Sequence, residues 1–419
     1  MRASLIDATS PTAASCNSYD RYRALAMRFL WFVAVVGIIR AFLVAPVTNS
    51  GTDFVPIWDA VQRYVHGVAV YNEDYSTSDP HYLYSLGANV VLAPLAVLGN
   101  FTVARWAMIF ATAVSVVVAI WLSARLLAPR LVTPLTVAAV AVFFNTSEPV
   151  ASTAKYTNIN GFLLLVMVVF VWCCVALDAP MRRQFARPEM WAAGVVLGYA
   201  VTIKPQFVVL TAVPVLLMQW PVLAVAVAFY AALFGLGWVT TAQPQLYVER
   251  LLPYLADPRD YDNGSLAAVL EQLGLGSAGQ IVFVGAVLAV VALAVIALFP
   301  LRNRHRAAWA FTTLGVLFAG VFLGGGLLQG YYVMWLIPLA MTIVLPRTPM
   351  AWPAMWVAVL LAVGGFADLF APAIRYGWPA SLTATAGWVL VPVIIAAWAL
   401  RENLLQRRAG AFSNGEHGA

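Results

Sequence analysis

The chain has 419 residues, of which 62% are hydrophobic and 10% are charged. Soluble domains contain about 45–50% apolar and about 25% charged residues, so this composition excludes a soluble globular protein and predicts an all-α polytopic membrane protein. The formal charge of +6 does not indicate nucleic-acid binding, because the basic residues occur in short clusters between apolar runs. The sequence contains no glycine-rich phosphate loop and no Cys/His cluster with metal-site spacing.

A membrane-spanning helix needs about 20 apolar residues. The shorter run 86–98 contains Pro94, and we interpret it as a re-entrant or juxtamembrane helix rather than a crossing. The sequence thus predicts about twelve crossings. The twelve runs that approach the required length are 29–47, 101–124, 131–146, 159–177, 190–203, 206–219, 221–241, 280–300, 307–323, 331–346, 351–366 and 381–400.

The basic residues predict the orientation, because cytoplasmic loops of membrane proteins carry an excess of Lys and Arg. Counting 86–98 as a crossing would move Arg125 and Arg130 outside, so the charge pattern favours twelve crossings with both termini inside. That topology places sixteen of the 24 basic residues in the cytoplasm, namely Arg2, Arg21, Arg23, Arg28, Arg125, Arg130, Arg182, Arg183, Arg187, Arg302, Arg304, Arg306, Arg347, Arg401, Arg407 and Arg408.

We therefore predict a cytoplasmic segment 1–28, a transmembrane domain 29–400 and a cytoplasmic tail 401–419, with the protein in the plasma membrane. The predicted outer loops are 48–100, 147–158, 242–279, 324–330 and 367–380.

The first outer loop is the most acidic part of the chain. It holds Asp53, Asp59, Glu73, Asp74 and Asp79, with Arg63 as its only strong base. Apolar residues from Phe54 to Val70 recur with helical spacing, at Phe54, Ile57, Trp58, Val61 and Val65, which favours a helix lying in the membrane interface. Asp53 directly precedes this stripe, so it is either a catalytic base at the membrane surface or an interfacial acid that caps the helix.

The chain has two lysines, Lys155 and Lys204, and both fall on the predicted outer side. Lys204 lies at the tip of the apolar hairpin 190–219. A charge at membrane depth costs about 2.5–3.5 kcal/mol, so its ammonium requires a partner. The two interpretations are a structural ion pair with Asp53 or Asp59, and a contact with a lipid-linked phosphate.

The outer loops also carry aromatic and amide side chains, which suit sugar recognition, since rings stack on sugar faces and amides bind hydroxyls. In loop 242–279 the Asn263-Gly264 turn and mixed charges instead favour a solvated loop. His81 and Arg259 are candidates for contacts with a phosphate. The candidate substrate-binding residues are Trp58, Tyr84, Asn158, Asn160, Tyr254, Tyr261, Gln329, Tyr331 and Tyr332.

Several short strings in these loops follow one another in the order seen in a known family. They are Asp53-Phe54, His81-Tyr82-Leu83-Tyr84, Thr157-Asn158-Ile159-Asn160-Gly161, Lys204-Pro205, Leu252-Pro253-Tyr254 with Arg259-Asp260-Tyr261, and Gln329-Gly330-Tyr331-Tyr332. With these strings the chain resembles the GT-C membrane glycosyltransferases of glycosyltransferase family 87, which use polyprenyl-phosphate sugars. The resemblance extends from about Asp53 to Pro346 and is strongest to the arabinofuranosyltransferase branch.

The resemblance implies a GT-C fold and inverting transfer of arabinofuranose from decaprenyl-phosphoryl-arabinose to arabinan. The product would be an α-1,3 branch in arabinogalactan or lipoarabinomannan, formed on the outer face with Asp53 as catalytic base. The chain departs from that branch at two places. It has Thr52-Asp53 where the branch carries two consecutive acids, which leaves one candidate base, and Ser85-Leu86 where the branch has Pro-Pro.

The expected mechanism needs no metal and no cofactor besides the lipid-linked donor. Asp53 takes the proton of the acceptor hydroxyl, while Lys204, His81 and Arg259 stabilise the departing phosphate. The partners would be the donor, the arabinan acceptor and membrane lipid.

Two other functions remain possible from the sequence. A mannosyltransferase using polyprenyl-phosphate-mannose would have the same cleft and base. A lipid transporter or flippase would show internal repeats and mid-membrane charges, whereas the polar residues here gather on one face.

Overall fold

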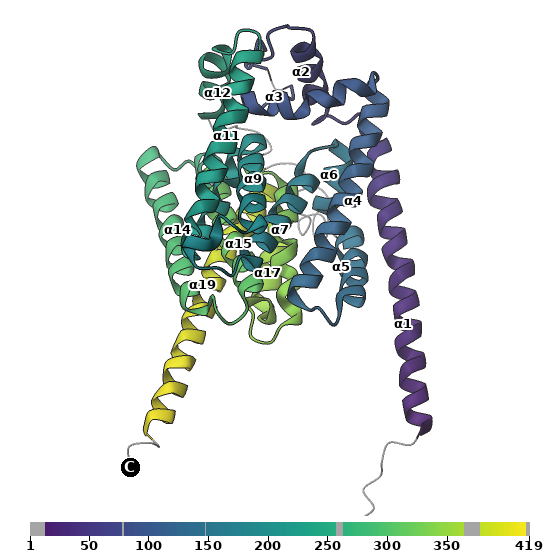
Figure 1. Cartoon of the computed structure of the whole chain (residues 1–419), viewed down its shortest axis with the longest axis vertical. Coiled ribbons are helices and arrows are strands. Elements are labelled where there is room, and N and C mark those ends of the chain that lie inside the picture. The colour runs from purple at the N-terminus through teal and green to yellow at the C-terminus, as the bar shows by residue number, and fades with distance from the viewer. Residues whose placement is uncertain (1–12, 78, 147, 257–262, 364–377, 416–419) are drawn as a thin grey trace, which may run out of the picture.

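In the computed structural model of the protein, every regular element within the described residues is helical. The described residues are 13–415 without Ser78, Ser147, 257–262 and 364–377. The helices form one bundle, and helices α2, α3 and α12 lie together at its upper end in Figure 1. The first and the last described helix both extend from the lower end, so the described chain begins and ends on the same side (Figure 1). This agrees with the prediction that both termini share one side of the membrane.

The α-helices differ widely in length. They are α1 (Ala13–Ile39), α2 (Val55–Val65), α3 (Leu86–Leu92), α4 (Phe101–Leu127), α5 (Val132–Thr146), α6 (Glu148–Tyr156), α7 (Asn160–Ala176), α8 (Met181–Gln184), α9 (Pro188–Ile203), α10 (Ala212–Leu216), α11 (Trp220–Thr240), α12 (Leu252–Ala256), α13 (Leu266–Gln272), α14 (Ser277–Leu298), α15 (Arg306–Gly324), α16 (Ile337–Ala340), α17 (Pro353–Ala362) and α19 (Trp378–Gly415).

Tighter or wider helical turns extend or link these helices. The π-helical turns are η1 (Arg40–Val44) and η5 (Tyr247–Leu251). The 3-10 turns are η2 (Ala45–Thr48), η3 (Ala93–Leu98), η4 (Pro205–Thr211), η6 (Phe299–Leu301), η7 (Gly330–Leu336), η8 (Met341–Val344) and η9 (Pro349–Ala351).

Each of the twelve predicted apolar runs coincides with helical structure over most of its described residues. Six helices in the described chain are long and apolar enough to cross a membrane, or seven if the bent pair Val132–Asn145 and Glu148–Tyr156 is one span. The chain is therefore a polytopic membrane protein. Five apolar helices of 10–17 residues and this bent pair coincide with the other predicted runs. The count of twelve crossings stays a prediction, because these helices are shorter than a bilayer normally requires.

The predicted interfacial stripe forms α2, with Phe54, Ile57 and Val61 fully or almost fully buried. The helix is shorter than predicted, since it ends at Val65, which is exposed. Its buried side faces the protein, because α2 packs against α3 and η3. The location of α2 in a membrane interface stays a prediction.

Segment 86–98 forms α3 and η3, which pack against α11 and α2. The buried hydroxyl of Ser85 donates to the carbonyl of Thr202 at 2.6 Å and so fixes the start of α3 to the end of α9.

The predicted hairpin 190–219 is present, and its second half, from Lys204 to Gln219, runs along α7. At one end, Lys204 contacts Asn160, the first residue of α7. At the other end, Gln219 donates to the carbonyls of Cys174 and Leu177 at 2.8 and 3.2 Å. The hairpin therefore carries Lys204 to the N-terminal end of α7.

Glycines on α9 allow a close approach to α11. A Cβ on Gly198 would lie 2.7 Å from the carbonyl oxygen of Ala226, and one on Gly194 would lie 2.5 Å from the Val225 side chain. Such small residues four apart are typical of membrane helix pairs, whose association depends on van der Waals packing. The α9–α11 contact therefore sets the position of Lys204 at the end of α9.

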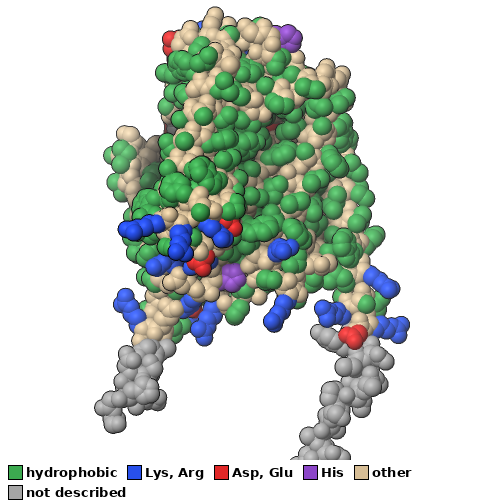
Figure 2. Space-filling view, viewed as in Figure 1, with side chains coloured by type: hydrophobic (Ala, Val, Ile, Leu, Met, Phe, Trp, Pro, Cys, Tyr) green, Lys and Arg blue, Asp and Glu red, His purple; other side chains and the backbone are tan. Residues whose placement is uncertain are grey.

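Basic side chains gather at the end of the molecule where the described chain begins and ends, below a predominantly hydrophobic surface (Figure 2). This distribution matches the predicted asymmetry of Lys and Arg.

Candidate active site

Asp53 lies in a tight turn between η2 and α2. The side-chain oxygen of Asn49 accepts from the backbone N–H groups of Gly51 and Thr52 at 2.7 and 3.0 Å. Gly51 has φ +84°, a left-handed conformation that glycine adopts without strain. The N-cap of α2 is Phe54 and no side chain caps the helix, so the interpretation of Asp53 as a helix cap is wrong.

Asp53 is half-buried and faces the segment between α6 and α7. Its backbone N–H donates to the carbonyl of Tyr156 at 3.2 Å, and the Asn158 amide donates to its carboxylate at 3.4 Å, a long hydrogen bond. The Tyr331 hydroxyl also hydrogen-bonds to the carboxylate. Burial first, and then the charge of Asp53, raise the pKa of Tyr84. The structure therefore brings four predicted site residues together: Asp53, Tyr84, Asn158 and Tyr331.

The charge of Lys204 interacts with that of Asp53 in this group. Its ammonium donates to the Asn160 side-chain oxygen at 2.8 Å and lies 4.9 Å from the Tyr332 ring centre and 5.4 Å from that of Trp335. Burial lowers the pKa of Lys204 to about 8, although the nearby charge of Asp53 acts in the opposite direction. A desolvated ammonium above two rings is a recognised way to hold a cation in an apolar site.

Asn160 orients this cation. Its backbone N–H donates to the Asn158 side-chain oxygen at 2.9 Å, and its carbonyl accepts from the Trp335 indole at 3.3 Å. The side chain is fully buried, and its NH2 group has no hydrogen-bond partner among the described residues. A buried ammonium and a buried unpaired N–H donor at one place fit an anionic ligand.

Three of the predicted site residues, His81, Tyr254 and Trp58, contact other residues instead. His81 is buried, lies 3.4 Å from a carboxylate oxygen of Glu73 and bonds to the Thr77 carbonyl at 3.1 Å. Its ring and that of Tyr254 pack together with Tyr75. The Glu73 carboxylate also pairs with Arg63 and accepts from the Tyr82 N–H.

The prediction that His81 stands beside Lys204 at a phosphate is thus not supported by its contacts, because a nearby carboxylate satisfies the imidazole. Trp58 packs against Phe54 and Phe101. Arg259 and Tyr261 lie outside the described residues.

Loop 242–279 is not solvated where it carries Asn263 and Ser265, which are 1% and 0% exposed. The Asn263 amide donates to the Gly326 carbonyl at 2.8 Å, and its oxygen accepts from the Leu328 N–H at 3.0 Å. The solvated-loop interpretation is therefore wrong for these residues, because the asparagine replaces water as the partner of backbone groups. These bonds fix the segment that leads into Gln329, whose carbonyl accepts from the Tyr332 N–H at 3.0 Å.

Sequence reasoning missed Arg105. It lies in α4 and donates to carbonyls of the turn before Asp53 and to Thr157 Oγ1. The signal was present, because an arginine five residues into the apolar run 101–124 is costly unless it has partners.

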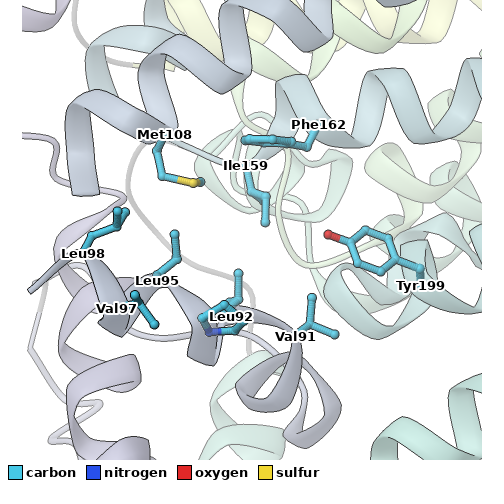
Figure 3. A pocket seen from close by; sticks show the side chains of 10 residues that line it. Val91, Leu92, Leu95, Val97, Leu98, Met108, Ile159, Phe162 and Tyr199 are labelled. Carbon is cyan, nitrogen blue, oxygen red and sulfur yellow. The ribbon is translucent and has the colours of Figure 1, made fainter. Parts of the chain in front are cut away.

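An apolar cavity of about 470 Å³ has Ile159, the chain neighbour of Asn158 and Asn160, in its wall. The rest of its lining comes from segment 86–98, α4, α7 and α9 (Figure 3). Figure 3 shows the Tyr199 hydroxyl directed into a cavity whose other lining side chains are hydrophobic. Such a cavity suits a hydrocarbon chain.

Comparison with known proteins identifies relatives of the chain. The family model described as glycosyltransferase family 87 matches residues 82–324. An α-(1→3)-arabinofuranosyltransferase of Corynebacterium glutamicum is 33% identical over 398 residues, which cover 93% of this chain and 92% of that protein.

Proteins of the same description in Mycobacterium tuberculosis and Mycolicibacterium smegmatis are 31% and 30% identical, over 87% of this chain and 83% and 84% of their own lengths. No solved structure matches the chain. Because the family model covers more than half of the chain and these relatives span most of it, the chain belongs to glycosyltransferase family 87.

Proposed function

We propose that the protein transfers arabinofuranose, with inversion, from decaprenyl-phosphoryl-arabinose to cell-wall arabinan and forms α-1,3 branches. The observation that carries the proposal is that the site contains one carboxylate, Asp53, and a separate buried cation site formed by Lys204 and Asn160. A base for the acceptor and a cation for the donor phosphate are the two groups that this reaction needs. The names of the relatives support arabinofuranose as the sugar.

Asp53 acts as the general base. An acceptor hydroxyl is a weak nucleophile, and a carboxylate that removes its proton as the bond forms contributes typically 10²–10⁴-fold. The hydrogen bonds from Asn158 and Tyr331 orient the carboxylate. A single acid that acts as the base suits a single displacement, which inverts the anomeric centre.

Lys204 and the Asn160 NH2 group stabilise the departing lipid phosphate. Negative charge builds on that phosphate as the glycosidic bond breaks, and fixed donors in a desolvated site act on it strongly. The phosphate would therefore bind above the Tyr332 and Trp335 rings. We propose that the reaction needs no metal and no cofactor other than the lipid-linked donor.

The apolar cavity beside Ile159 accommodates the first part of the polyprenyl chain. Its hydrophobic lining, and the presence in its wall of Ile159, the chain neighbour of Asn160, support this assignment. A chain held there would enter from the membrane, while the sugar would face Asp53.

The proposal also includes the fold of the enzyme and its orientation in the membrane. The chain would have the GT-C fold with twelve crossings, both termini in the cytoplasm and the active site on the outer face of the plasma membrane. The gathering of basic residues near both ends of the described chain supports this orientation.

Purified protein in lipid nanodiscs tests the proposal. We expect transfer of label from decaprenyl-phosphoryl-arabinose to a linear arabinan, and linkage analysis should find new α-1,3 branch points. Asp53→Asn is the negative control. Transfer from decaprenyl-phosphoryl-mannose alone would establish the mannosyltransferase instead. Movement of intact lipid between leaflets without transfer would favour a flippase.

A further inference from the structure

Arg105 connects two segments that approach each other at Asp53. Two of its hydrogen bonds go to segment 46–49 and two to segment 155–157. Nη2 donates to the carbonyls of Pro46 at 2.6 Å, Asn49 at 2.7 Å and Lys155 at 3.4 Å, and Nε donates to Thr157 Oγ1 at 3.1 Å.

A residue in the left-handed conformation lies within or just after each segment, beside this side chain. Gly51 has φ +84°, and a Cβ there would lie 2.6 Å from Arg105 Nε. Thr157 has φ +59°, which is strained for a β-branched residue and persists only where the surroundings enforce it. Asp53 follows the first turn by two residues, and Asn158 directly follows the second.

We propose that Arg105 is a positioning residue for the transfer reaction: it holds the segment of Asp53 against the segment of Asn158 and so fixes the direction of the carboxylate. This inference rests on the proposed function of Asp53. Arg105 acts through the two backbone segments and not on the substrate.

The chemistry of the guanidinium suits this role. It is permanently charged, and its planar donors can serve several carbonyls in fixed directions. Within the described chain Arg105 forms no ion pair, so backbone and hydroxyl dipoles balance its charge. An ammonium in its place would keep the charge but could not reach both segments in the same geometry.

The test compares Arg105→Gln and Arg105→Lys with a matched control. Arg40 also donates to two backbone carbonyls, those of Phe144 and Asn145 at 3.2 and 3.1 Å, but at the end of α5. Arg40→Gln therefore removes two arginine–carbonyl hydrogen bonds elsewhere, together with a 3.9 Å ion pair to Glu148. Thr157→Val keeps the side-chain shape, removes one Arg105 contact and provides a milder variant in case Arg105→Gln does not fold.

A small displacement of a reacting group can lower a rate about 10²-fold. We expect a loss in kcat of this order for Arg105→Gln and of about tenfold for Arg105→Lys and Thr157→Val, with donor KM within about threefold of wild type. Arg40→Gln should retain the wild-type kcat. In the Asp53→Asn background Arg105→Gln should cause no further loss, because the base that it positions is absent.

Hydrogen exchange gives a readout that does not depend on transfer activity. The amide of Asp53, bonded to the Tyr156 carbonyl, should exchange faster in Arg105→Gln than in Arg40→Gln at similar unfolding midpoints. Unchanged exchange and kcat, or a similar loss of kcat in the Asp53→Asn background, would overturn the role of Arg105. A wild-type protein that transfers no sugar would refute the proposed function. The exchange result would still test whether Arg105 holds the two segments together.

Discussion

Replacing Lys204 by Met removes the buried ammonium and nearly preserves the length of the side chain. The pKa of Lys204 falls from its usual 10.5 to about 8. One pKa unit corresponds to about 1.4 kcal/mol, so the charged ammonium costs the folded protein about 3 kcal/mol at neutral pH. Removing the donor leaves Asn160 Oδ1 unsatisfied, which costs about 1–3 kcal/mol. The net effect on the free energy of unfolding should lie between about 0 and +2 kcal/mol.

Donor binding, in contrast, should become weaker in this variant. A charge-assisted hydrogen bond contributes about 1.5–3 kcal/mol, so Lys204→Met should weaken donor binding about 10- to 150-fold. Only the ammonium form binds the phosphate strongly, and in the free protein it is lost as the pH rises through about 8. The wild-type affinity should therefore fall roughly tenfold per pH unit above 8, while that of Lys204→Met should stay flat.

Binding of labelled decaprenyl-phosphoryl-arabinose to nanodisc-embedded protein measures the affinity, and unfolding in mixed detergent micelles followed by circular dichroism measures the stability. If Lys204 instead forms a structural ion pair, the variant should lose about 3–5 kcal/mol of stability. That loss, with unchanged donor binding per folded molecule, would refute the assignment of the phosphate site.

Three further predictions follow from the site and the topology. Asp53→Asn should lower turnover at least 10²-fold and leave donor binding intact. The control is Asp59→Asn, since Asp59 is exposed on α2. An inactive Asp59→Asn together with an active Asp53→Asn would reassign the base. In intact cells an impermeant thiol reagent should label Ser76→Cys and leave Arg408→Cys unlabelled; the reverse would invert the topology. Asn263→Ala should lower the free energy of unfolding by about 3 kcal/mol, measured as a lower unfolding midpoint, because buried backbone partners lose their bonds; an unchanged midpoint would contradict this account.

Some features of the site could be predicted because they are local. The order of motifs in the outer loops indicated Asp53, Asn158, Asn160 and Lys204 as separate candidates. Their grouping could not be predicted from periodicity, since Asn158 and Asp53 are 105 positions apart and Asn160 and Lys204 are 44 apart. His81 shows the limit of this reasoning, because its pairing with Glu73 depends on how the first outer loop folds.

The sequence by itself determined the class of the protein, the positions of the apolar helices and the basic side, because hydropathy and charge act locally along a chain. Tertiary structure decided which polar residues meet. Gly194 and Gly198 let α9 approach α11 and so place Lys204 at the start of α7. Arg105 joins two turns that lie about 50 to 60 positions away in the chain. Such contacts depend on the shape of the packed helices, which no local pattern of residues specifies.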